Sequence, residues 1–148
     1  FEMKNEKSKK SKEIIIVAIL SIFIIAEIIC FFAIKLTFSK EEKMIYDIVY
    51  QKQSEFKNPS TVKITDAAIY DGKYIILQMG GNNSFGAFVK DTYYIKDNTL
   101  YTKDKNYTIA KEIIGKCFEC EKNNSRNILE LNENSINKIN SKLEKRYK

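Results

Sequence analysis

The longest hydrophobic run in the chain extends from residue 14 to residue 34 and contains one ionised side chain, Glu27. At about 1.5 Å per residue, a helix of this length spans about 31 Å, which matches the hydrocarbon core of a bilayer. A helix buried in a soluble protein rarely stays apolar on every face for so long. The pattern predicts a transmembrane anchor over residues 14–36, preceded by a tail over 1–13 and followed by a polar domain over 39–148.

Flanking lysines predict the orientation of this anchor. Five lysines lie in the short tail before it, and fewer lie close behind it. By the positive-inside rule, the tail is expected in the cytoplasm and the carboxy-terminal domain outside it. The run is longer than a signal-peptide core of about 7–15 residues, and no small-x-small cleavage site follows. We therefore expect a retained, single-pass protein of the cell membrane, with the lipid bilayer as its first partner.

Glu27 is the unusual residue of the anchor, because a carboxylate at that depth costs about 3 kcal/mol on insertion scales. Small side chains occupy a neighbouring helical face, which favours close approach of a second helix. One interpretation is a contact with another membrane protein, or self-association, through Ala26, Glu27, Cys30 and Ala33. The alternative is that the surrounding hydrophobic residues simply tolerate one acid.

Beyond the anchor, the hydrophobic spacing alternates between helical and strand periods. Helical spacing predicts a helix that begins at Ser39 and ends before Pro59. Alternating or β-branched positions predict strands over residues 61–69, 74–79, 85–96 and 99–102. Tight turns are expected at Asp71-Gly72 and at Asp97-Asn98. The second strand is apolar at nearly every position, which indicates either cover on both of its faces or a central position in the sheet.

The carboxy-terminal part of the chain predicts a helix over 108–121, an edge strand over 128–131 and a final helix capped by Asn132. In that last helix Ile136, Ile139 and Leu143 are expected to point inward and the lysines, Lys138 among them, outward. The expected fold is α+β. A single transmembrane helix precedes a small domain, in which an antiparallel meander of three to four strands is flanked by amino- and carboxy-terminal helices.

Charge and composition narrow the functional classes. The formal net charge is +6, but basic and acidic residues are interspersed over the domain. The sequence therefore does not predict a continuous basic surface that binds nucleic acid. Histidine, the commonest general base and metal ligand, is absent from the sequence. No catalytic residue, cofactor or metal site is predicted. The abundance of Ile, Lys and Asn is typical of an AT-rich coding sequence from a low-GC bacterium.

Cys117 and Cys120 form the only Cys-x-x-Cys pair in the sequence. In an exported domain this spacing fits a structural disulfide or free thiols, a redox-labile disulfide, or part of a metal site. A four-ligand zinc site would need a second pair or histidines, which the sequence lacks. The pair is thus a candidate disulfide or redox site.

Residues 82–86 form the most distinctive loop of the sequence, Asn82, Asn83, Ser84, Phe85 and Gly86. Nearby glycines permit unusual backbone angles, so an exposed recognition loop is one interpretation. The other is a bulged hairpin connection, whose asparagines tolerate left-handed conformations.

Three segments resemble a group of exported or membrane-anchored proteins of low-GC Gram-positive bacteria. They are Phe56-Lys57-Asn58-Pro59-Ser60-Thr61-Val62, Asn83-Ser84-Phe85-Gly86 and Ile136-Asn137-Lys138-Ile139-Asn140. The resemblance covers roughly residues 40–147. The group has no assigned activity, so the resemblance implies structural roles for these motifs and no functional residues.

These observations predict a membrane-anchored protein whose extracytoplasmic domain binds or assembles with a partner and is not an enzyme. The alternative is a membrane-tethered thiol-redox protein that uses Cys117 and Cys120.

Overall fold

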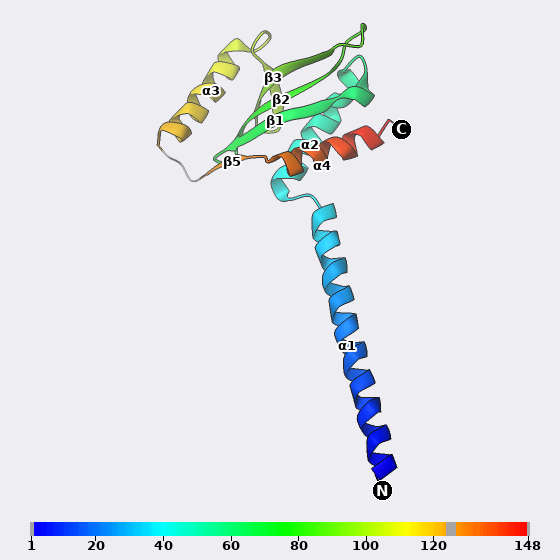
Figure 1. The fold of residues 1–148 in the computed structure, drawn as a ribbon. Helices are drawn as coiled ribbons and strands as arrows, with labels where there is room; N and C mark the ends of the chain where they lie inside the picture. Colours follow the sequence, from blue (N-terminus) through cyan, green and yellow to red (C-terminus); the bar gives the residue numbers. More distant parts are fainter. Residues whose placement is uncertain (1, 124–126, 148) are drawn as a thin grey trace. The chain divides into compact units, whose positions relative to one another are not determined.

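A computed structural model describes residues 2–123 and 127–147 of the chain, and it describes side chains for 14–31, 37–123 and 127–147. The chain divides between Ser39 and Lys40 into two compact units. The first unit is one helix, α1 (Glu2–Leu36), drawn in blue in Figure 1. It includes one stretch, Ile14–Phe31, that is long and apolar enough to cross a membrane, with a mean hydropathy of 3.1.

Every side chain from Ile14 to Phe31 is exposed within the chain. Apolar surface of this extent is stable only where lipid or another protein covers it. The chain leaves the helical conformation over residues 37–39, so α1 and the first helix of the domain, α2 (Lys40–Lys52), are separate elements.

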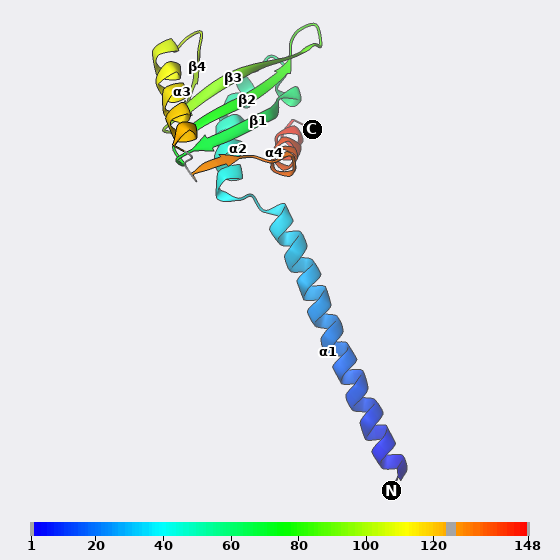
Figure 2. The ribbon, with the colours of Figure 1, turned by 60° about the vertical axis from the view of Figure 1, so that its left-hand side comes forward.

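A five-stranded antiparallel sheet forms the centre of the domain, in the order β4-β3-β2-β1-β5 (Figures 1 and 2). The sheet therefore has more strands than the three to four that the sequence predicted. The chain returns after its last long loop and pairs residues 128–130 with residues 68–70 of β1. The strands are β1 (Lys63–Tyr70), β2 (Tyr74–Asn82), β3 (Phe88–Lys96), β4 (Thr99–Thr102) and β5 (Ile128–Glu130).

Both predicted tight turns are confirmed by their backbone angles. Asp71 and Gly72 have φ values of 50° and 64°, and Lys73 N–H donates to the carbonyl of Tyr70 at 3.0 Å. Asp97 and Asn98 also have positive φ, at 50° and 59°. Left-handed angles at both central positions give a hairpin the twist that its strands need.

Helices cover both faces of the sheet, in agreement with the apolar pattern of β2 (Figure 2). On one face lie α2 and α4 (Glu133–Lys145), which contact each other while α4 also contacts β1. On the other face lies α3 (Tyr107–Lys122). Because alternate residues of a strand point to opposite faces, β2 contributes to both cores. Its odd-numbered residues 75, 77 and 79 are buried, while Tyr74 and Ile76 pack with the α3 core.

The first domain helix is shorter than predicted. α2 ends at Lys52, and two 3₁₀ turns, Gln53–Glu55 (η1) and Pro59–Thr61 (η2), lead into β1. The buried amide of Gln53 stabilises this path, donating from Nε2 to the carbonyls of Pro59 (2.9 Å) and Leu143 (3.1 Å). Phe56, which was expected on the helix, lies instead in the connection between the two turns.

The last helix begins as predicted, since the Asn132 side chain accepts a bond of 2.9 Å from the amide of Ser135. Ile139 and Leu143 are fully buried. The expected outward position of Lys138 is wrong. Its ammonium lies 2.8 Å from the carboxylate of Glu42 on α2, where it neutralises a buried acid.

Candidate functional site

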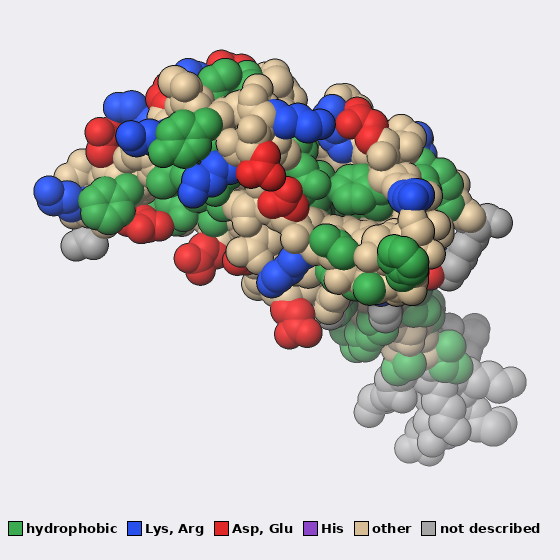
Figure 3. All heavy atoms as spheres, turned by 90° about the horizontal axis from the view of Figure 1, so that it is seen from above, with side chains coloured by type: hydrophobic (Ala, Val, Ile, Leu, Met, Phe, Trp, Pro, Cys, Tyr) green, Lys and Arg blue, Asp and Glu red, His purple; other side chains and the backbone are tan. Residues whose placement is uncertain are grey.

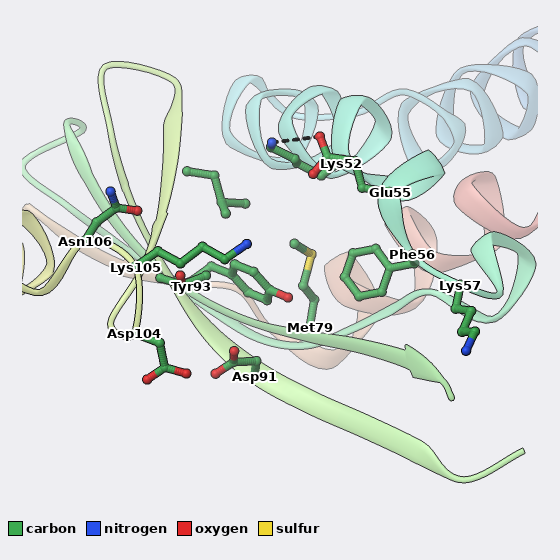
Figure 4. Close-up of a pocket in the computed structure, with 12 residues that line it drawn as sticks. Lys52, Glu55, Phe56, Lys57, Met79, Asp91, Tyr93, Asp104, Lys105 and Asn106 are labelled. Atoms are coloured by element: carbon green, nitrogen blue, oxygen red, sulfur yellow. Dashed lines mark hydrogen bonds and ion pairs between the residues drawn. The ribbon is translucent and has the colours of Figure 1, made fainter. Parts of the chain in front are cut away.

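A groove of about 500 Å³ opens on the α2 side of the sheet, over β3 and β4 (Figure 4). The helices on this face leave that part of the sheet uncovered. Its floor comes from side chains that share this face of three adjacent strands, namely Met79, Asp91, Tyr93, Leu100 and Thr102. One wall is the end of α2 and η1, and the other is the loop of residues 104–106.

The base of the groove is apolar. Phe56, Met79 and Tyr93 converge on it in Figure 4, and Met79 is completely buried. Phe56 and Tyr93 are only half-buried, so each presents part of its ring to the groove. A concave surface with an aromatic floor fits a protruding apolar side chain or a small apolar ligand.

The rim of the groove carries both basic and acidic side chains. Lys52 and Glu55 form an ion pair of 2.8 Å at one wall. Lys105 extends toward the groove in Figure 4, whereas Lys57 points away from it. Burial, followed by the charges of Asp91 and Glu55, raises the pKa of Tyr93. The Tyr93 hydroxyl is therefore neutral at ordinary pH and can donate or accept a hydrogen bond.

Residues 83–87 connect β2 and β3 as a tightly bonded hairpin loop, and Asn82 is the last residue of β2. The Asn83 side-chain oxygen accepts from the amides of Phe85 (2.9 Å) and Ala87 (3.1 Å). Gly86 has a φ of 78°, which an L-residue adopts with strain. Asn58 donates from Nδ2 to the carbonyls of Asn82 and Asn83 at 2.8 and 3.0 Å, which holds the base of the loop.

The tip of this hairpin exposes large hydrophobic side chains. Phe85 is 94% exposed, Val89 is 55% exposed and Phe88 is 44% exposed. Ser84 is exposed beside them. The loop thus combines a fixed backbone with an uncovered aromatic ring, and its role in recognition stays a prediction. Exposed apolar side chains of this size are typical of surfaces that a partner covers.

The outer edge of β3 is open next to the groove. β4 pairs with β3 only over residues 93–96, and Figure 2 shows β3 running on toward the hairpin tip. In the part of the chain that the structure describes, no strand pairs with residues 88–92 on this side. Unpaired strand edges present backbone donors and acceptors to other chains.

The direction of these backbone groups follows from the hairpin. Asn83 N–H donates to the carbonyl of Ala87 at 2.9 Å, and bonded and non-bonded pairs alternate along an antiparallel ladder. The odd-numbered residues of β3 therefore bond to β2, and Phe88, Lys90 and Thr92 direct their backbone groups outward. The Thr92 amide already donates to the Asp91 carboxylate at 2.7 Å.

The cysteine pair lies at the interface between α3 and the sheet, away from the groove. Cys117 and Cys120 are both free thiols and both buried. Burial raises the pKa of the Cys117 thiol to about 12, helped by Cys120 and Glu121. A hydrogen bond of 3.0 Å to the Asp71 carboxylate raises the pKa of Cys120. Thiol exchange requires the thiolate, which this environment disfavours.

The proposed membrane contact residues remain a prediction. Ala26, Glu27 and Cys30 are exposed on α1, and the side chain of Ala33 lies outside the described residues. Among the described residues, no group of three or more His, Cys, Asp or Glu side chains could hold a metal. On the face of the domain seen in Figure 3, basic, acidic and hydrophobic side chains alternate over short distances.

Sequence reasoning missed the groove. Its floor residues were assigned to strands, but no pattern indicated that α2 would end at Lys52 and leave Phe56 facing β3. Comparisons with models of protein families, with curated proteins and with solved structures found no match to this chain.

Proposed function

We propose that the chain is a single-pass membrane protein whose extracytoplasmic domain binds a segment of a partner protein in the groove over β3 and β4. The observation that carries this proposal is the pair of half-buried aromatic rings in the groove, Phe56 from its wall and Tyr93 from its floor. The exposed side chain of Val89 shares the groove face of β3, so it extends the apolar surface from the groove toward the hairpin. Protein interfaces are built around such aromatic anchors.

A binding role is better supported than a thiol-redox role. A reactive cysteine is partly exposed and has a lowered pKa, whereas Cys117 and Cys120 are buried and have raised pKa values. The groove offers an ion pair, the ammonium of Lys105, two further acids and a tyrosine, with no cysteine or serine nucleophile among its lining residues. This set suits recognition.

Site-specific photo-crosslinking in the native host tests this function. A photoreactive residue in place of Lys105 faces the groove, and we expect it to yield a discrete adduct with one protein. The same residue in place of Lys111, exposed on α3, is the matched control and should give none. A Phe56→Ala change in the Lys105-labelled chain should remove the adduct. Equal adducts from both positions would refute binding at the groove.

A further inference from the structure

We infer that the partner segment binds as an added β-strand along the outer edge of β3, over Phe88–Thr92, with acidic side chains facing Lys90 and apolar side chains facing the groove. This inference rests on the proposed function and specifies how that site recognises its partner. The edge supplies the affinity through main-chain hydrogen bonds, and the neighbouring groove supplies specificity, as in other strand-addition complexes.

The backbone geometry favours this mode of binding. Phe88 and Lys90 direct an amide and a carbonyl outward, and β4 ends at Thr102, opposite Tyr93. An extended segment placed here continues the line of β4 without displacing any strand. At Thr92, a bond to the added segment replaces the local bond that the Thr92 amide donates to the Asp91 carboxylate.

The two faces of the added strand meet different chemistry. Residues next to Asp91 and Val89 point their side chains to the groove face, toward Tyr93 and Met79. Residues of the added strand next to Lys90 point their side chains to the opposite face of the sheet, outside the core that α3 covers. The bound segment therefore needs a sequence in which apolar and polar residues alternate.

The charge of the β3 edge determines which side chains suit the polar positions of the bound segment. Across the sheet, Lys63 of β1 lies opposite Gly80 of β2, and Gly80 lies opposite Lys90 of β3. Two lysines thus share one row with only a glycine between them, and the Lys90 ammonium has a long contact of 3.4 Å to Gln78. A carboxylate in the next position of that row complements both charges.

The same row argues against a second copy of this chain as the occupant. Pairing two β3 edges about Lys90 places Lys90 opposite Lys90 of the other copy, and like charges directly opposite each other destabilise a sheet. A lysine on an open edge is also a common device against self-pairing. The expected partner is thus a different chain with acidic residues at alternate positions.

Binding of synthetic peptides to the full chain in detergent micelles tests the inference. The probe is a short end-blocked peptide in which Leu and Glu alternate, and the control peptide carries Lys in place of every Glu. We expect saturable binding of the Leu-Glu peptide, with affinity about tenfold above that of the Leu-Lys peptide, and a reversed preference in Lys90→Glu. Equal affinity for both peptides, or binding of neither, would overturn the inference.

Two variants distinguish the contribution of the Lys90 backbone donor to binding from that of the Lys90 side chain. Lys90→Pro removes an outward donor while leaving the β2 ladder intact, whereas Lys90→Ala keeps that donor. We expect Lys90→Pro to bind the Leu-Glu peptide about tenfold more weakly than Lys90→Ala does. Unfolding curves and amide spectra check that the proline variant folds, and equal affinity in a folded Lys90→Pro would contradict strand addition.

Amide hydrogen exchange gives an independent readout that needs no variant. In the free chain the amides of Phe88 and Lys90 should exchange fast, and those of Val89 and Asp91 slowly. The Leu-Glu peptide should slow exchange at Phe88 and Lys90 specifically. Peptide bound without this alternating protection would refute strand addition and leave groove binding intact. Dimerisation that Lys90→Pro abolishes would assign the edge to a second copy and also overturn the inference.

Discussion

At the scale of single residues, buried polar side chains set the packing of the helices. Glu42 on α2 is buried and accepts from the Ser135 hydroxyl (2.7 Å) and the Lys138 ammonium (2.8 Å) on α4. Removing one partner of a buried pair leaves an uncompensated charge, which is far more costly than losing a surface pair. Lys138 therefore stabilises the contact between two helices that are distant in sequence.

This role is tested by comparing two Lys→Met substitutions. Lys138→Met should lower the free energy of unfolding by about 2–3 kcal/mol, because it removes the ammonium that lies 2.8 Å from the buried Glu42 carboxylate. Lys43→Met, which breaks the exposed Lys43–Asp47 pair of α2, should change the free energy of unfolding by less than about 0.5 kcal/mol. Denaturant unfolding followed by tyrosine fluorescence measures both, and equal effects would contradict the buried role of Lys138.

The Cys117 thiol gives the domain a dependence on alkaline pH. Burial raises its pKa from 9.0 to about 12, so the folded state keeps a proton that the unfolded state loses. The contribution is complete below about pH 9 and declines as the pH rises from there toward 12, by at most about 1.4 kcal/mol per pH unit. Denaturant unfolding between pH 8 and pH 11 should show this decline. Cys117→Ala should reduce its slope, and an unchanged slope would refute the assignment.

At the scale of elements, two glycines with opposite surroundings show where the backbone tolerates a side chain. A Cβ on Gly80 of β2 would lie only 2.7 Å from the Cα of Lys90, closer than real contacts allow. Gly115 in α3 has open space around it. The first glycine permits the close pairing of β2 and β3, whereas the second merely lowers the helical propensity of α3.

Alanine substitutions at these positions should therefore act in opposite directions. Gly80→Ala is expected to destabilise the domain by about 1–3 kcal/mol through overpacking. Gly115→Ala is expected to stabilise it by up to about 1 kcal/mol, since alanine favours the helix. Denaturant midpoints measure both changes, and a loss of stability in Gly115→Ala would show that its surroundings are not open.

Local signals in the sequence predicted most of these elements. The Asp-Gly and Asp-Asn turns, the cap at Asn132 and the apolar run of β2 each act over a few residues, so they were predicted correctly. The edge strand over 128–131 was expected, but its place in the same sheet was not, because its pairing with β1 joins residues about sixty positions apart. The groove was missed because its lining comes from four separate segments, and no local pattern specifies how those meet.

At the scale of the whole molecule, one apolar helix precedes one domain with its own core. Ile14–Phe31 is fully exposed within the chain, which supports insertion into a bilayer. The lysines of the tail favour a cytoplasmic amino terminus, and the proposed extracytoplasmic position of the groove depends on that orientation.

Cysteine labelling in intact cells tests this orientation. Lys103→Cys places a thiol on an exposed turn of the domain, and a membrane-impermeant maleimide should label it without permeabilisation. Lys9→Cys in the tail should be labelled only after permeabilisation. The native cysteines give little background, since Cys30 lies in the apolar span and the other two are buried. The opposite pattern would invert the orientation.

The amide of Asn58 has a consequence for how the domain responds to a bound segment. Its two hydrogen bonds tie the carbonyls of Asn82 and Asn83 to the connection that also carries Phe56. A shift of this backbone connection must therefore either break these two bonds or move the base of the hairpin with it. Asn58 thus joins the wall of the groove to the base of the loop that carries Phe85.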